Sequence, residues 1–181
     1  MTTVLCPGLH GPELTQRFRQ AIPAREFSQP LLQYPGSPLS PRQLRIFLAQ
    51  SVDPAQPLTL VAFSAGTVGA SAAAHHWHYR YQTVAALLAL DGWGVPLAAP
   101  FPIYRLSHDY FTHWSSALLG AGDHSFYADP PVRHLDLWRS PDHVWGYCHR
   151  RHEGVSQDDR LLSNDSTTLT AAEFIQQCVI Q

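Results

Sequence analysis

The stretch Leu58–Ala70, LTLVAFSAGTVGA, holds an apolar run, a serine and a run of small residues in that order. The nearly continuous apolar run Leu58–Phe63 is typical of a strand buried on both faces of a parallel sheet. The small residues of Thr67–Ala74 are compatible with a helix. Ser64 is therefore expected at a tight turn between a buried strand and a helix. A plainer interpretation makes Ser64 an ordinary helix N-cap.

Apolar runs and helical patterns alternate along the rest of the chain. Short apolar runs predict further strands at Thr3–Cys6, Gln29–Tyr34, Val84–Leu90, Ile103–Leu106 and Ser125–Ala128. Helical patterns and capping signals predict further helices at Pro12–Ala21, Pro41–Gln50, Tyr110–Leu119, Ser140–Arg151 and Thr170–Ile180. Strands that alternate with helices indicate an α/β fold with a mostly parallel sheet, and we expect three α/β/α layers. In such sheets ligands bind beyond the carboxyl ends of the strands.

Size and composition set the class of protein. The chain has 181 residues, of which 45% are hydrophobic and 14% charged, as suits one folded domain over 1–181. Within that domain we expect residues 153–181 to form a polar loop and a C-terminal helix. The net charge of −2 leaves no basic surface for nonspecific nucleic-acid binding.

Two further sequence features bear on class and location. The three cysteines include no C-x-x-C pair, which argues against a zinc ribbon or a thioredoxin-type site. We see neither a signal-peptide pattern nor an apolar run long enough for a membrane span. We therefore expect a soluble, cytoplasmic protein.

The residues around Ser64 resemble the nucleophile elbow of the α/β-hydrolases, G-x-S-x-G. Ala62 stands where the first Gly of that motif falls, and Gly66 matches the second. The resemblance extends over about residues 2–152 and implies a small, cap-less, lipase- or esterase-like member with Ser64 as nucleophile. It implies no cofactor.

A second part of the resemblance is the loop Cys6–Pro12, CPGLHGP, which follows the first predicted strand. In this family such a loop supplies one backbone N–H of the oxyanion hole, and the residue after the nucleophile supplies the other. By resemblance these donors are Leu9 and Ala65. The alternative interpretation of the loop is a plain Gly/Pro turn.

The family places its acid and then its histidine after the nucleophile in the chain. The resemblance implies His134 as general base and Asp109 as the acid that orients it. Asp91, which directly follows the strand Val84–Leu90, is the alternative acid, because some members place the acid one strand earlier. Three further histidines are alternative bases: His143, His149 and His152.

Several aromatic residues fall in the loops beside these positions. We expect an apolar acyl pocket lined by His10, Trp93, Tyr110 and Trp114, in a region that also holds Tyr104 and Phe111. Core packing is the alternative role for these aromatics.

Three functions follow from the sequence. The first is a serine hydrolase that acts on a carboxylic ester or related acyl bond of a small molecule. The second is an inactive hydrolase-fold module used for binding or assembly. The third is a metal-dependent hydrolase built on His108, Asp109 and His113. Zinc-binding histidines on a helix prefer i, i+4 spacing, however, and His108 and His113 lie five positions apart. We therefore expect no metal.

Overall fold

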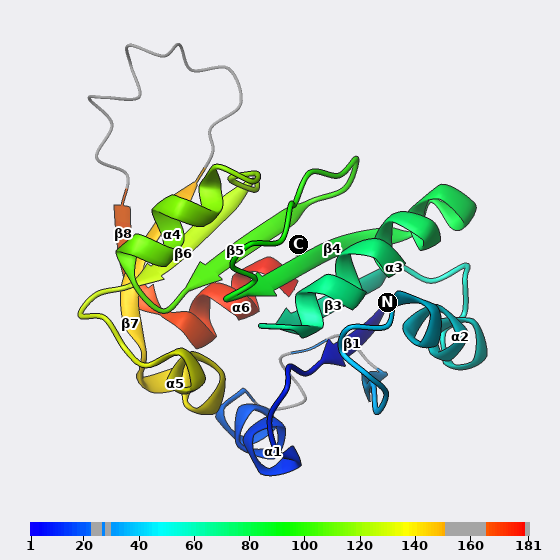
Figure 1. Ribbon diagram of the computed structural model, residues 1–181, viewed down its shortest axis with the longest axis horizontal. Coiled ribbons are helices and arrows are strands. Elements are labelled where there is room, and N and C mark those ends of the chain that lie inside the picture. Colours follow the sequence, from blue (N-terminus) through cyan, green and yellow to red (C-terminus); the bar gives the residue numbers. More distant parts are fainter. Residues whose placement is uncertain (23–26, 28–29, 151–165, 180–181) are drawn as a thin grey trace.

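The structure, a computed structural model, describes residues 1–22, 27, 30–150 and 166–179 (Figure 1). Its strands are β1 (Thr2–Cys6), β2 (Leu31–Gln33), β3 (Leu58–Phe63), β4 (Val84–Leu90), β5 (Ile103–Ser107), β6 (His124–Ala128), β7 (Trp145–Arg150) and β8 (Ser166–Thr170). Its α-helices are α1 (Pro12–Ala21), α2 (Pro41–Ser51), α3 (Gly66–Tyr81), α4 (Tyr110–Ala117), α5 (His134–Arg139) and α6 (Ala171–Val179).

The strands form one sheet in the order β2-β1-β3-β4-β5-β6-β7-β8. Strands β1 to β6 pair in parallel, whereas β7 and β8 are antiparallel to their neighbours. The predicted α/β class with a mostly parallel sheet is confirmed. Because parallel strands end at the same edge, the loops after β1, β3, β4, β5 and β6 meet there.

Helices cover both faces of the sheet, with α3 and α4 in front of it and α6 behind it in Figure 1. One apolar core joins the sheet to α1, α5 and α6, and the other joins it to α2 and α3. In the first core Trp138 is fully buried and stacks on Phe18 with a ring-centroid distance of 3.7 Å. Phe63, the last residue of β3, stacks on the same indole at 5.2 Å.

Local capping signals explain where several helices begin. The Ser40 hydroxyl accepts a hydrogen bond from the backbone N–H of Gln43 at 3.3 Å, as its predicted N-cap role requires. Thr170 and Glu173 form the predicted capping box, with each side chain accepting from the other residue's backbone N–H.

The predicted helix Ser140–Arg151 is wrong. Ser140 and Pro141 begin only a short 3₁₀ turn, and the chain then enters β7. Apolar Val144 and Cys148 are buried four residues apart, a spacing that fits one helix face as well as alternate positions of a strand. Gly146 lies so close to the carbonyl of Tyr127 that a Cβ would clash with it, and this contact belongs to the sheet.

Strand β8 is a second difference from the sequence prediction. The expected loop before the C-terminal helix contains this strand, which pairs with β7. Its sequence, STTLT, offers one apolar side chain, Leu169, to the core. An edge strand of this kind has almost no hydrophobic period, so only the pairing with β7 identifies it.

No helix in the described part of the chain is long and apolar enough to cross a membrane.

We predict that Trp138→Ala lowers the free energy of unfolding by about 3–5 kcal/mol, since it removes the largest fully buried side chain of the core. Urea denaturation of the purified chain measures this. Trp114→Ala is the matched control, because Trp114 is 54% exposed, and we expect a change within about 0.5 kcal/mol. Equal losses in the two variants would contradict the assignment of Trp138 to the core.

Candidate functional site

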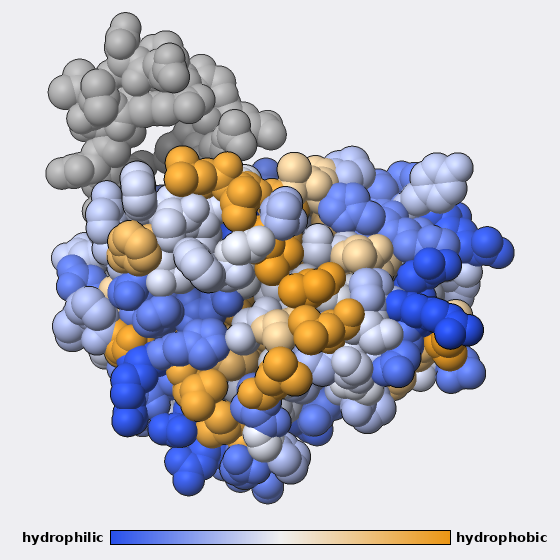
Figure 2. Space-filling view, viewed as in Figure 1, coloured by the Kyte–Doolittle hydropathy of each residue, from blue (hydrophilic) through white to orange (hydrophobic). Residues whose placement is uncertain are grey.

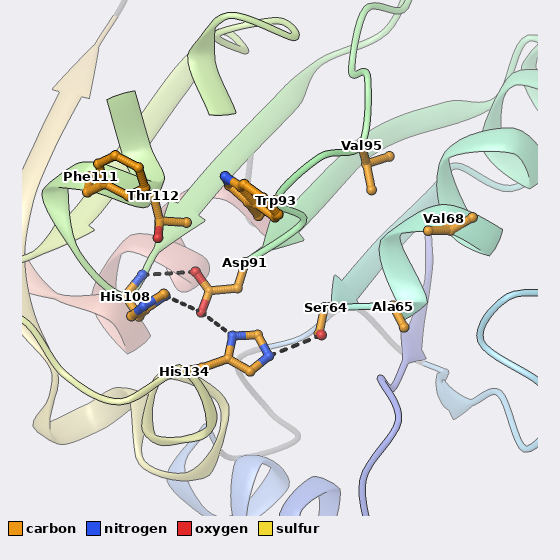
Figure 3. A pocket seen from close by; sticks show the side chains of 10 residues that line it. All are labelled: Ser64, Ala65, Val68, Asp91, Trp93, Val95, His108, Phe111, Thr112 and His134. Carbon is orange, nitrogen blue, oxygen red and sulfur yellow. Dashed lines mark hydrogen bonds and ion pairs between the residues drawn. The ribbon is translucent and has the colours of Figure 1, made fainter. Parts of the chain in front are cut away.

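Four polar side chains meet at the carboxyl ends of the strands (Figure 3). Ser64 directly follows β3, Asp91 directly follows β4, and His108 directly follows β5. His134 is the first residue of α5, the helix that follows β6. The sheet thus brings together residues that lie up to 70 positions apart in the chain.

Ser64 lies at a sharp strand-to-helix turn. Its φ angle of 51° is in the left-handed region, which a residue with a Cβ adopts only at a cost. Gly66 explains how tightly the turn packs, because a Cβ there would clash with the carbonyl oxygens of Cys6 and Pro7. Ala62, the departure from the family motif, is fully buried in the core beneath α3, so its methyl group is accommodated.

A continuous series of hydrogen bonds runs from Asp91 through His134 to Ser64. His134 Nδ1 lies 2.8 Å from Asp91 Oδ2, and His134 Nε2 lies 3.0 Å from Ser64 Oγ. Because an ionised carboxylate only accepts, Nδ1 carries the proton and Nε2 presents its lone pair to the Ser64 hydroxyl. Phe63 stacks on the imidazole of His134 at 4.8 Å and holds the ring in this orientation.

The Asp91 carboxylate also binds His108. The backbone N–H of His108 donates to Oδ1 at 2.9 Å, and ring Nδ1 lies 2.9 Å from Oδ2. The other ring nitrogen, Nε2, lies 3.3 Å from an Asp109 carboxylate oxygen. The hydrogen bond to Asp91 raises the pKa of His108, against the opposing effect of burial. His108 therefore links the two aspartates, a role that the sequence analysis missed.

The residue that meets His134 Nδ1 is Asp91, the alternative, and not Asp109, so the expected contact between Asp109 and His134 is wrong. The carboxylate of Asp109 instead caps α4 and accepts from the backbone N–H of Thr112 at 2.6 Å. Asp109 lies two residues beyond the end of β5, where the chain turns into a helix, and a short acidic side chain there favours capping. Asp91 comes directly after its strand, at the edge of the sheet.

The two expected oxyanion donors lie at the Ser64 turn and in the loop next to it. Ala65 follows Ser64 and is the N-cap of α3, and Leu9 lies in the loop after β1. That loop lies against the turn, because a Cβ on Gly8 would be 3.1 Å from the Cβ of Ser64. Within the described residues, the backbone N–H groups of Leu9 and Ala65 donate no hydrogen bond. Ala65 lines the cavity beside Ser64, whereas Leu9 lines the neighbouring cavity between the loops after β1 and β2.

A cavity of about 370 Å³ opens beside Ser64. Its lining residues are Ser64, Ala65, Val68, Asp91, Trp93, Val95, His108, Phe111, Thr112 and His134 (Figure 3). Apolar side chains also gather across the middle of this face of the molecule (Figure 2). The site therefore joins four polar side chains to a largely apolar hollow.

Of the four expected pocket residues, one lines the cavity beside Ser64 and three do not. Trp93 lines the cavity beside Ser64, but Tyr110 and Trp114 are exposed residues of α4 outside that lining. His10 lines a separate cavity of about 430 Å³ between the loops after β1 and β2. The sequence analysis missed three lining residues. The rotation of α3 and α4 about their axes brings Val68 and Thr112 into the lining, and the path of the loop after β4 brings in Val95. No local sequence signal specifies these features.

Of the other histidines considered as bases, the two that the structure describes, His143 and His149, have contacts elsewhere. His149 stacks on Tyr127 at 5.5 Å and on His113 at 5.6 Å, and burial lowers its pKa. His143 lies beside Asp142, with its side chain 82% exposed. His152 lies outside the described residues.

The metal-ligand set suggested by the sequence is not assembled as expected. His113 packs against Tyr127 and His149, and burial lowers its pKa to about 4. Among the described residues, the group that can offer three ligand atoms to one ion is Asp91, His108 and His134.

Cys6 ends β1 just before the loop that carries Leu9. Burial raises the pKa of its thiol to about 12. The thiolate, which is the nucleophilic form, is therefore absent near neutral pH.

A comparison with protein-family models found no match, and no curated protein matches the chain in sequence. The likeness to α/β-hydrolases therefore depends on the motif around Ser64 and on the way the sheet gathers the site.

We predict that Ser64→Gly is more stable than Ser64→Ala by about 1 kcal/mol, because only glycine adopts a left-handed φ without strain. Both variants lose the hydroxyl and its hydrogen bond, so the difference between their free energies of unfolding reports the backbone strain together with the contacts of one methyl group. Urea denaturation of the two variants side by side measures it. An Ala variant as stable as the Gly variant would contradict a strained turn.

Proposed function

We propose that the chain is a serine hydrolase of the α/β-hydrolase type, acting on a carboxylic ester or related acyl bond. The observation that carries the proposal is the hydrogen-bonded series from Asp91 through His134 to Ser64. The left-handed turn at Ser64, between a parallel strand and a helix, supports it further. A nucleophile, a base and a group that orients the base are the three parts that such chemistry needs.

In the proposed reaction, Ser64 Oγ attacks the acyl carbonyl while its proton passes to His134 Nε2. Asp91 stabilises the imidazolium that forms, because its carboxylate accepts the Nδ1–H. The backbone N–H groups of Leu9 and Ala65 bind the oxyanion of the tetrahedral intermediate. The intermediate collapses when His134 returns the proton to the leaving oxygen, which leaves Ser64 acylated. Water, deprotonated by His134, then releases the acid and restores Ser64.

The cavity beside Ser64 suits an uncharged acyl group. Trp93 and Phe111 line one part of it, and Val68 and Val95 line another. Apolar walls with a few polar groups at one end are typical of small-molecule sites of about this volume. The polar end is the one that holds Ser64.

An inactive binding module is the second function that the sequence left open. Such a module needs no base at the serine. The 3.0 Å contact between His134 Nε2 and Ser64 Oγ therefore favours the hydrolase.

We predict that a fluorophosphonate probe labels the wild-type chain and does not label Ser64→Ala or His134→Ala. Asp91→Asn should label about 10⁴-fold more slowly, because an amide favours the wrong tautomer of the histidine. Gel fluorescence over time measures these rates, and circular dichroism checks that each variant folds.

Asp109→Asn is the matched comparison, since asparagine caps a helix as well as aspartate does. We expect its labelling rate to fall by less than about tenfold, far less than in Asp91→Asn. Labelling of Ser64→Ala, or a larger loss in Asp109→Asn than in Asp91→Asn, would contradict the proposed roles.

A further inference from the structure

Three potential metal ligands converge beside Ser64. Asp91, His108 and His134 each offer one ligand atom, and these atoms all lie within 4.8 Å of one another. Two imidazole nitrogens and one carboxylate oxygen form a donor set that suits Zn²⁺ and similar ions. Only two of the three side chains belong to the series that ends at Ser64, so His108 takes no direct part in the proposed proton transfer.

We propose that Asp91, His108 and His134 form a binding site for a divalent transition-metal ion such as Zn²⁺, and that the bound ion inhibits the enzyme. The inhibitory part rests on the proposed hydrolase function, whereas the binding site does not. Metal binding and catalysis exclude each other at this site, because both need the Asp91 carboxylate and the His134 imidazole.

The ligands sit on well-defined parts of the fold. Asp91 and His108 directly follow the adjacent strands β4 and β5, and His134 begins α5. The two imidazole rings are 5.8 Å apart, centroid to centroid, and lie at 80° to each other. They approach the carboxylate from different directions, as ligands around one ion must.

The present distances are those of hydrogen bonds, 2.8 Å and 2.9 Å from Asp91 Oδ2 to the two Nδ1 atoms. A tetrahedral Zn²⁺ with bonds near 2.0–2.1 Å needs its ligand atoms roughly 3.3 Å apart. Each oxygen–nitrogen pair must therefore move apart by about half an ångström, and the two Nδ1 atoms, which lie within 4.8 Å of each other, must also come to about 3.3 Å. The ion then replaces the protons now held between these atoms.

The surroundings of the three ligands also fit a metal site. A metal-bound histidine usually donates its other ring N–H to a carboxylate or a carbonyl, which fixes its orientation. The Asp109 carboxylate lies 3.3 Å from His108 Nε2 as an ion-pair contact, close enough to take this part when the ion binds. The free oxygen of Asp91, Oδ1, accepts the backbone N–H of His108 at 2.9 Å. All three ligands line the cavity beside Ser64, which gives an ion a path and a water molecule room as fourth ligand.

Metal binding would reverse the role of His134. Its Nδ1 proton leaves when the ion binds, so a neutral ring must carry its proton on Nε2. Nε2 then donates to Ser64 Oγ and cannot take the Ser64 proton. Asp91, bound to the ion, no longer stabilises an imidazolium. The ion therefore removes the base from the nucleophile without covering the cavity.

Isothermal titration calorimetry on the full chain, free of any tag and stripped with a chelator, tests the site. We expect wild type to bind one Zn²⁺ at this site and His108→Gln to lose that binding. Asp109→Asn should bind about 10–100-fold more weakly, because it alters only the partner of a ligand. His143→Gln, an exposed histidine changed in the same way, should bind as wild type does. Mg²⁺, which prefers oxygen ligands, should not bind.

The same protein tests inhibition. Fluorophosphonate labelling of wild type should fall as Zn²⁺ fills the calorimetric site, with the same midpoint, and a chelator should restore it. Ser64→Ala should bind Zn²⁺ as wild type does, which separates binding from catalysis.

Each contrary result has a separate meaning. Equal Zn²⁺ binding by wild type, His108→Gln and Asp109→Asn would overturn the site. Binding with undiminished labelling, or labelling that requires Zn²⁺, would overturn the inhibitory role. Zn²⁺ binding in a chain that never labels, with or without chelator, would uphold the site and defeat the proposed hydrolase.

Discussion

The buried carboxylate of Asp91 is the constraint on which the site depends. Its side chain is only 1% exposed and receives three hydrogen bonds, two from His108 and one from His134. A buried carboxylate is costly unless such donors satisfy it, because it has left water. The loops after β4 and β5 and the start of α5 must therefore keep fixed distances from one another. The same distances hold His134 Nε2 against Ser64, so stability and site geometry have one origin.

The two neighbouring strands β3 and β4 end in the same way. Ser64 and Asp91 each follow the last residue of a strand with a left-handed φ, 51° and 50°. The N–H of Ser64 donates to the carbonyl of Leu90, and the N–H of Asp91 donates to that of Leu106, both at 2.8 Å. In both turns, therefore, the first residue after the strand still donates a backbone hydrogen bond to the neighbouring strand. Repetition of this geometry on adjacent strands places Ser64 and Asp91 at one edge of the sheet, with His134 between them.

Sequence alone predicted the parts of the fold that have strong local signals. Strand β3, strand β4 and helix α1 have the predicted bounds, because long apolar runs and a helical period identify them. The resemblance to the α/β-hydrolases also implied that Ser64 and His134 would meet, and the two side chains lie 3.0 Å apart. The sequence analysis chose Asp109 over Asp91, because both aspartates follow strands and only three-dimensional structure shows which carboxylate turns toward His134. Strands β7 and β8 could not be predicted, because only their pairing with each other identifies them. The role of His108 could not be predicted either, because it depends on contacts with Asp91, which is distant in the sequence.

The most direct test of this account is the protonation state of His134, read by nitrogen-15 NMR of the histidine side chains near neutral pH. Comparison with His134→Gln assigns its signals. The account predicts that the proton sits on Nδ1 in the wild type, because Asp91 accepts it, and moves to Nε2 in Asp91→Asn. A wild-type ring with its proton on Nε2 would contradict the account, since His134 would then be a donor to Ser64 and not its base.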